Sequence, residues 1–166
     1  MSNTLAAIER VCGEGAVTGL KGKIYVACSK DVATLGAASA GVVTTITMVT
    51  DKVFEPFDIA AVRTKNGIES TYEGDKDHGV QMNALTVVLP GITGAKNTIL
   101  DGMKGCPHIV IYESKGGKKF LLGDLEDGAF AQPSSTLNGE TNAYTLVLTA
   151  ENAYMPHEFD GTVPVT

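Results

Sequence analysis

Four residues of one polar segment have the types and spacing of the start of a calcium-binding loop. Glu73, Asp75, Asp77 and Gly79 lie close together, and carboxylate oxygens are the ligands that Ca2+ prefers. The twelfth position of such a loop, counted from Asp75, is Thr86, where a bidentate Glu is needed. We therefore expect a solvated acidic turn rather than a calcium site.

A second set of metal-ligating residue types consists of Cys106 and His108, on either side of Pro107. The other histidines, His78 and His157, are isolated in the sequence, so no second ligand pair has the spacing of a zinc site. The sequence predicts no metal and no cofactor.

The three cysteines are Cys12, Cys28 and Cys106. An odd number cannot pair completely within one chain, and no CxxC spacing is present. We therefore expect reduced, mostly buried thiols.

Catalytic residue types do not gather in a recognisable pattern. Residues 114–119, Ser-Lys-Gly-Gly-Lys-Lys, have the small and basic residues of a phosphate-binding loop, but not its order, and they join two strand-like runs. No Ser, His and Asp set follows a nucleophile elbow. The sequence predicts a hairpin turn at residues 114–119 and a protein that is not an enzyme.

The composition is that of a folded soluble chain. Its 166 residues are 43% hydrophobic and 19% charged, which suits one domain over residues 1–166 with a single core. No apolar run approaches the roughly 20 residues that span a bilayer, and the N-terminus lacks the features of a secretory signal, so we expect no membrane contact and a cytoplasmic site of synthesis. The net charge of -6 argues against a surface that grips nucleic acid.

The segment 80–123 organises the predicted fold. Apolar runs at residues 84–89, 109–112 and 120–122 are short, rich in β-branched and aromatic residues and bounded by Gly and Pro, which predicts strands. Between the first two runs, an apolar stripe at helical spacing predicts one helix; its members are Ile92, Ala95, Ile99 and Met103.

The other predicted strands cover residues 24–28, 42–49, 53–57 and 143–149, and Pro56 marks the third as an edge or a bend. Residues 34–41 and 124–141 are turn-like. A short segment, 1–22, with a helix over Thr4 to Val11, precedes the strands, and an extended tail with little core, 151–166, follows them. The predicted fold is mainly β, a β-sandwich or open barrel with one flanking α-helix.

Residues 64–81, called the arm below, alternate as a strand should on both sides of a very polar centre. Either a short hairpin turns at Asn66-Gly67, or one long hairpin runs out to about Glu73 and returns from about Gly79; we favour the long form. Its outer half has too few large apolar residues for the chain's own core, so it should project and contact another subunit. The candidate contact residues are Thr64, Lys65, Asn66, Gly67, Tyr72, Glu73, Asp75, Asp77, Gly79 and Gln81.

The order of strand, helix, strand, Gly-containing turn and terminal strand resembles that of bacteriophage tail tube proteins, particularly tube-like proteins from phages and prophages of Bacteroidetes bacteria. The resemblance covers about residues 12–159. It rests on the IYVAC strand with Asp31-Val32 after it, the strand from Gly41 to Met48, the arm centred near Asp75, and the runs VIYESKGGKKFLLG and NAYTLVLTAENAYMPHEF. The hairpin turn in the first of these runs is more basic than the family pattern.

This resemblance implies a structural virion subunit whose β-sandwich assembles into stacked hexameric rings around a channel for DNA in the viral tail. The implied partners are further copies of the chain, other tail or connector proteins, and DNA that passes without specific binding. An acidic subunit suits such a channel, because Lys and Arg would bind phosphates and slow passage. Two other classes remain open: a capsid decoration or head-tail joining protein, and a stand-alone binding module or small enzyme.

Overall fold

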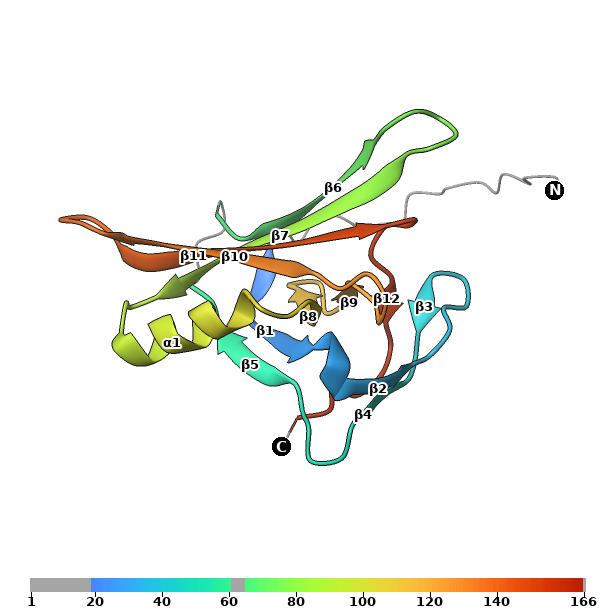
Figure 1. The fold of residues 1–166 in the computed structure, drawn as a ribbon, viewed down its shortest axis with the longest axis horizontal. Coiled ribbons are helices and arrows are strands. Elements are labelled where there is room, and N and C mark those ends of the chain that lie inside the picture. The colour runs from blue at the N-terminus through green and yellow to red at the C-terminus, as the bar shows by residue number, and fades with distance from the viewer. Residues whose placement is uncertain (1–18, 61–64, 166) are drawn as a thin grey trace.

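Three β-sheets make up most of the described chain, which comprises residues 19–60 and 65–165 of a computed structural model (Figure 1). The six-stranded sheet contains, in spatial order, β3 (Val42–Val43), β12 (Glu158–Phe159), β9 (Lys119–Leu122), β8 (His108–Ser114), β1 (Leu20–Cys28) and β5 (Glu55–Asp58). The four-stranded sheet contains β10 (Phe130–Leu137), β11 (Asn142–Asn152), β7 (Val80–Pro90) and β6 (Gly67–Glu73). The remaining elements are the β2 (Val32–Leu35) and β4 (Ile46–Met48) pair, the 3-10 turn η1 (Ser29–Asp31) and the helix α1 (Gly94–Met103).

The six-stranded and four-stranded sheets pack face to face around the larger of two apolar clusters. Val110 and Tyr112 of β8 meet Leu85 of β7 and Leu146 of β11 there, and all four side chains are buried. Successive side chains of a strand point to opposite faces, so β7 and β11 bury every second residue and turn the others outward. The predicted β-sandwich with one helix is confirmed.

The other face of the six-stranded sheet carries the second cluster. Ile109 and Ile111 of β8 pack there with Phe54 and Phe159, and the β2 and β4 pair covers them. Strand β8 is therefore buried on both faces.

Thr93 caps the N-terminus of the helix α1, because its hydroxyl accepts a hydrogen bond from the backbone N–H of Lys96 at 3.2 Å. It buries Leu100 and Met103, whereas Ile99 is 55% exposed. The predicted apolar stripe is wrong at Ala95 and Ile99, which are both exposed. The buried face is turned by about one position, because Leu100 reaches the sheet.

Several predicted strands are confirmed: residues 24–28 lie in β1, 109–112 in β8, 120–122 in β9 and 143–149 in β11, while β5 is an edge strand as Pro56 indicated. The strand predicted over residues 42–49 is wrong, because the chain breaks at Thr44 and Thr45 into β3 and β4 of different sheets. Strand β10 and the second half of β2 fall in segments predicted to be turn-like.

The C-terminal segment is more firmly attached than a tail with little core. Strand β11 continues to Asn152, and β12 pairs with both β3 and β9. Phe159 is 1% exposed in the second cluster, so the expectation that this segment adds little to the core is wrong. The predicted helix over residues 4–11 and Cys12 lie outside the described residues.

Candidate interaction surface

The arm is an antiparallel hairpin that projects from one end of the four-stranded sheet (Figure 1). Its strands pair continuously from Gly67 opposite Thr86 to Glu73 opposite Val80. The long form of the hairpin is thus confirmed, and the alternative turn at Asn66-Gly67 is wrong.

Glycines and an aromatic ring shape the turn at the tip of the arm, residues 74–79. Gly74 has a φ of 111°, which side chains disfavour. Gly79 passes so close to the ring of Tyr72 that a Cβ atom there would overlap it. The Tyr72 hydroxyl donates to the Asp75 carbonyl at 2.8 Å. The turn is therefore specified locally, while its charged side chains stay exposed.

Most of the predicted contact residues of the arm lie at its surface. Lys65, Tyr72, Glu73, Asp75 and Asp77 are exposed, and Gly67 and Gly79 are half-buried backbone positions. Thr64 lies outside the described residues.

The other two predicted contact residues, Asn66 and Gln81, serve the subunit's own fold. The Asn66 amide donates to the carbonyl of Ala60 and its oxygen accepts from the N–H of Val88 at 2.8 Å. Gln81 is 8% exposed and donates to the Ser70 hydroxyl at 3.0 Å. Both side chains are thus paired within the chain, and their contact with another subunit stays a prediction.

A buried polar cluster fixes the root of the arm to the body. Asn83 is 1% exposed; its amide oxygen accepts from Ser70, and its amide nitrogen donates to the Asn152 side chain at 3.4 Å and to the Tyr154 carbonyl at 3.1 Å. Buried amides without partners are costly, so this pairing holds β6, β7 and the segment after β11 in one arrangement.

Asp124 links this cluster to the loop before β10. Its carboxylate accepts from the Tyr154 hydroxyl at 2.7 Å and from the backbone N–H groups of Glu126 and Asp127. Burial acts to raise the pKa of Asp124, but these hydrogen bonds outweigh it and leave that pKa below its ordinary value. The same carboxylate and the burial of the ring raise the pKa of Tyr154. Asp124 is therefore an ionised anchor rather than a proton donor.

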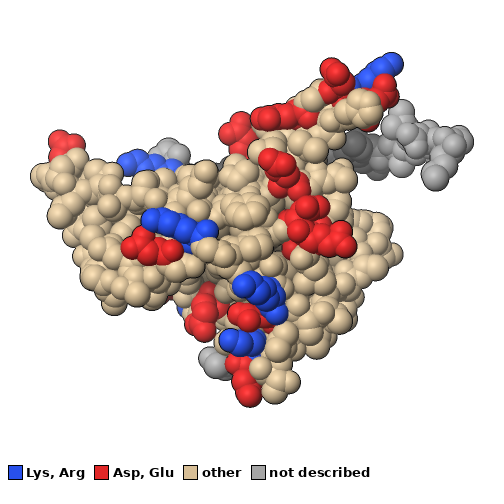
Figure 2. Space-filling view, viewed as in Figure 1, with Lys and Arg blue, Asp and Glu red and all other residues tan. Residues whose placement is uncertain are grey.

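The outer face of the four-stranded sheet carries no basic side chain: none of the residues of β6, β7, β10 and β11 is Lys or Arg. Glu69 and Glu73 of β6 and Glu151 of β11 are exposed acidic residues of these strands. Their neighbours on the outward positions are small, polar or apolar; examples are Met82, Ala84, Thr86, Val147, Thr149 and Gln132. Figure 2 shows acidic side chains along the arm and on the surface beneath it.

The four-stranded sheet has two unpaired edges within the described chain. Strand β6 pairs only with β7, and β10 pairs only with β11. Open strand edges are templates for pairing with another chain. On β10, Phe130 and Leu137 are 60% and 71% exposed, so this edge also offers apolar contact area.

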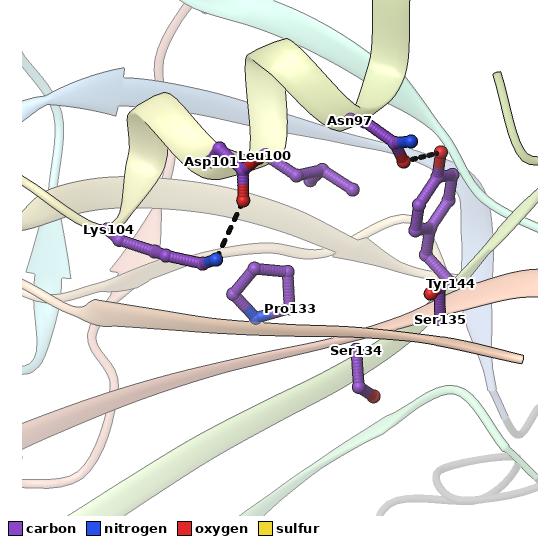
Figure 3. A pocket seen from close by; sticks show the side chains of 8 residues that line it. All are labelled: Asn97, Leu100, Asp101, Lys104, Pro133, Ser134, Ser135 and Tyr144. Carbon is purple, nitrogen blue, oxygen red and sulfur yellow. Dashed lines mark hydrogen bonds and ion pairs between the residues drawn. The ribbon is translucent and has the colours of Figure 1, made fainter. Parts of the chain in front are cut away.

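A shallow pocket of about 270 Å³ lies between α1 and β10 (Figure 3). Inside it the Tyr144 hydroxyl donates to Asn97 at 2.5 Å, and Lys104 pairs with Asp101 at 2.7 Å. The Ser134 hydroxyl points away from α1 (Figure 3) and donates to the Thr145 carbonyl at 3.2 Å, and no histidine is among the residues that line the pocket. These contacts join the helix to the sheet and do not form a nucleophile and base pair.

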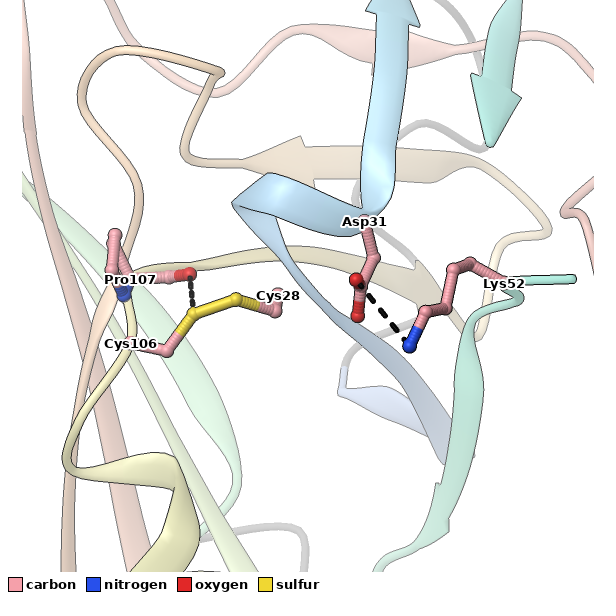
Figure 4. The surroundings of a disulfide bond; sticks show 5 residues. All are labelled: Cys28, Asp31, Lys52, Cys106 and Pro107. Atoms are coloured by element: carbon pink, nitrogen blue, oxygen red, sulfur yellow. Dashed lines mark hydrogen bonds and ion pairs between the residues drawn. A yellow bond between two sulfur atoms is a disulfide. The ribbon is translucent and has the colours of Figure 1, made fainter. Parts of the chain in front are cut away.

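The Cys28 and Cys106 side chains form a disulfide that joins the end of β1 to the loop before β8 (Figure 4). The prediction of reduced thiols is wrong at these two positions. The backbone explains the pairing, because Cys28 lies opposite His108 in the sheet and the Ser29 N–H donates to the Pro107 carbonyl at 2.9 Å. Because its sulfur is part of the disulfide, Cys106 is not available as a thiolate ligand for a metal.

His108 is buried beside the disulfide, and its Nδ1 atom has no hydrogen-bond partner among the described residues. Burial lowers its pKa below the ordinary value of 6.5, and a backbone hydrogen bond with Ala129 opposes part of that effect. Within residues 19–60 and 65–165, His, Cys, Asp and Glu side chains do not gather in threes as a metal site requires.

The Ser114 to Lys119 segment is a turn between β8 and β9, as predicted. The Ser114 N–H donates to the Lys118 carbonyl at 2.8 Å, and Gly117 has a φ of 92°. Lys118 forms an ion pair with Glu158 at 3.1 Å, yet its side chain remains 65% exposed. The turn therefore presents positive charge to solvent and does not form a phosphate-binding loop of backbone N–H groups.

No helix in the described residues has the length and apolar character needed to cross a bilayer. Comparison of the chain with protein-family models, curated proteins and solved structures found no match.

Proposed function

We propose that the protein is a tail tube subunit of a bacteriophage or prophage, made in the bacterial cytoplasm and built into the virion tail as stacked hexameric rings around a channel for DNA. The other tail or connector proteins would meet the two ends of the tube. The resemblance described above suggested this function, and one structural observation supports it most directly.

That observation is the absence of Lys and Arg from the four strands of the arm-bearing sheet. A DNA duplex carries roughly one negative charge per 1.7 Å of its axis, so a basic channel wall would hold it. A wall with exposed Glu69, Glu73 and Glu151 repels phosphates instead. We assign this face to the channel.

The open edges of the same sheet supply a way to close the ring. If β6 of one copy pairs with β10 of the next, six copies make a barrel of roughly 24 strands. At a strand spacing of about 4.8 Å, and with ordinary tilt, the barrel is roughly 40 to 50 Å across between backbones, which leaves a channel wide enough for a DNA duplex. Closure also removes the exposed edges, which otherwise favour aggregation.

Closure in this way directs the arm along the tube. Strands that pair around a ring run roughly along its axis, so a hairpin that extends β6 and β7 reaches beyond its own ring. An isolated two-stranded ribbon is only marginally stable in water, and a neighbouring ring would order it.

The test is assembly of the purified full chain. Light scattering should report polymers, and electron micrographs should show rings or tubes with sixfold symmetry and a central channel. In a reconstruction, β6 of one copy should lie beside β10 of its neighbour, with the outward face of the sheet toward the channel.

A protein that stays monomeric at high concentration contradicts the proposal, and so does a polymer whose channel is lined by the six-stranded sheet. A capsid decoration protein would instead bind preformed capsids without forming tubes on its own.

A further inference from the structure

The tip of the arm is acidic. Glu73, Asp75 and Asp77 are exposed there against one basic residue, Lys76. Because the hairpin carries these charges away from the body, the lysines of the body do not neutralise them (Figures 1 and 2). An acidic projection of this kind favours a basic partner surface.

Among the turns of the described chain, residues 114–119 carry the largest group of basic side chains. Lys115 and Lys118 are exposed, and neither Asp nor Glu occurs within the turn. Lys119 is used internally, since its amino group donates to the Gly161 carbonyl and lies over the Phe159 ring. Lys118 pairs with Glu158 but keeps a largely exposed side chain, so Lys115 and Lys118 are the side chains that a second molecule would meet.

The basic turn lies toward the end of the subunit away from the arm tip. At its start, β8 is close to the arm, since Pro107 lines a pocket with Met82 and Glu151. At its other end the Lys115 N–H donates to the Gly19 carbonyl. Three residues further on, the Gly22 carbonyl accepts from the Ile59 N–H. The next residue, Ala60, donates its N–H to the carbonyl of Val88, near the end of β7 that is away from the arm tip.

We propose that the acidic tip of the arm of one copy binds the basic turn, residues 114–119, of a copy in the next ring. This inference rests on the proposed tube, in which the two ends of each subunit face neighbouring rings. The charges then fix the order of stacking: acidic end meets basic end, whereas two acidic or two basic ends repel.

The test uses two reversed variants of the full chain. One carries Glu73→Lys, Asp75→Lys and Asp77→Lys; the other carries Lys115→Glu and Lys118→Glu. Each alone presents like charges at the contact between rings, so tube elongation, followed by light scattering, should slow roughly tenfold or more, because the contact repeats around the ring. Rings should still form, as counted in micrographs.

Mixing the two variants supplies the decisive measurement. An alternating stack again brings opposite charges together, so the mixture should elongate at close to the wild-type rate. Recovery on mixing also shows that both variants are folded. A control with Lys30→Glu and Lys52→Glu should elongate normally, because these residues lie beyond the Cys28 end of β1, whereas the basic turn adjoins the Leu20 end.

Each failure points to a different step. If the wild-type chain forms tubes and the reversed variants elongate equally fast, or if mixing restores nothing, the pairing of tip and turn is wrong while the tube stands. If the tip-reversed variant no longer closes rings, the tip acts between neighbours of one ring, which also overturns the pairing. A wild-type chain without tubes refutes the proposed function itself.

Discussion

The amide nitrogen of Asn83, near the start of the arm-bearing strand β7, lies 3.1 Å from the backbone carbonyl of Tyr154, and the two residues are 71 positions apart in the sequence. Asn83 thereby ties the root of the arm to the segment that leads into β12. This buried amide adds a side-chain link to the strand pairing that fixes the base of the arm.

Replacement of Asn83 by Ala should lower the free energy of unfolding by about 2 kcal/mol, because it removes the donor to the Tyr154 carbonyl and to the amide oxygen of buried Asn152. Urea unfolding followed by circular dichroism measures the change. Thr71→Ala, on the exposed face of the same arm, is the control and should alter stability by less than about 0.5 kcal/mol. An equal loss of unfolding free energy in both variants would show that the hydrogen bonds of the buried Asn83 amide do not stabilise the fold.

Replacement of residues 74–79 by Asn-Gly should abolish tube growth and leave the sandwich folded. Glu73 and Val80 are direct partners, so a two-residue turn can join them. The removed residues lie outside both apolar clusters, and the midpoint of thermal unfolding should hardly change. Hydrogen exchange should show the arm protected in tubes and open in free subunits. Equal protection in both, with normal growth of the shortened variant, would place the interface elsewhere.

Two lysines on the outer face of the four-stranded sheet should make assembled tubes retain DNA. Glu69→Lys with Glu151→Lys adds positive charge where we place the channel, and the retention should weaken steeply with salt. Filter binding of duplex DNA at low salt measures it. Glu55→Lys with Asp160→Lys makes the same change of net charge near the six-stranded sheet and should retain little. If both pairs retain DNA equally, the assigned face does not line the channel.

Acidification should destabilise the protein through His108. Burial lowers its pKa in the folded state below 6.5, so the unfolded state binds more protons. Its contribution to stability is complete above pH 6.5 and declines as the pH falls through and below that value. In His108→Gln this decline should be absent from unfolding curves recorded between pH 7 and about pH 5. His78→Gln, at the exposed tip of the arm, should keep the wild-type dependence.

Loss of the disulfide should reduce stability without changing the fold. Cys28 and Cys106 close a loop of 78 residues, and Cys28→Ser with Cys106→Ser should lower the free energy of unfolding by about 2 to 4 kcal/mol. Under non-reducing conditions, mass spectrometry should find the two cysteine peptides linked. Free thiols at both positions, or equal stability of the double variant, would contradict this bond.

Much of the fold could be predicted because its strands are short apolar runs between Gly and Pro residues, as in residues 109–112 and 120–122. Strand β10 was missed because Pro133, Ser134 and Ser135 are typical of turns. An edge strand tolerates them, since a missing N–H need not interrupt the sheet. The place of Ile99 was missed because a helix with apolar residues at neighbouring positions can turn either of them to the sheet.

The arm was found because its tip is too polar for any core, a signal that needs no tertiary information. The intrachain partners of Asn66 and Gln81 could not be predicted, because sequence does not distinguish an exposed amide from one that pairs with a distant strand. The bond between Cys28 and Cys106 depends on β1 lying beside β8, and no local spacing reports such long-range pairing.

Strand β8 supplies Val110 and Tyr112 to one apolar cluster and Ile109 and Ile111 to the other. Neither cluster can unfold while the other keeps its packing, because both would lose the same strand. The subunit should therefore unfold in one cooperative step, without a partly unfolded intermediate that exposes apolar surface during assembly.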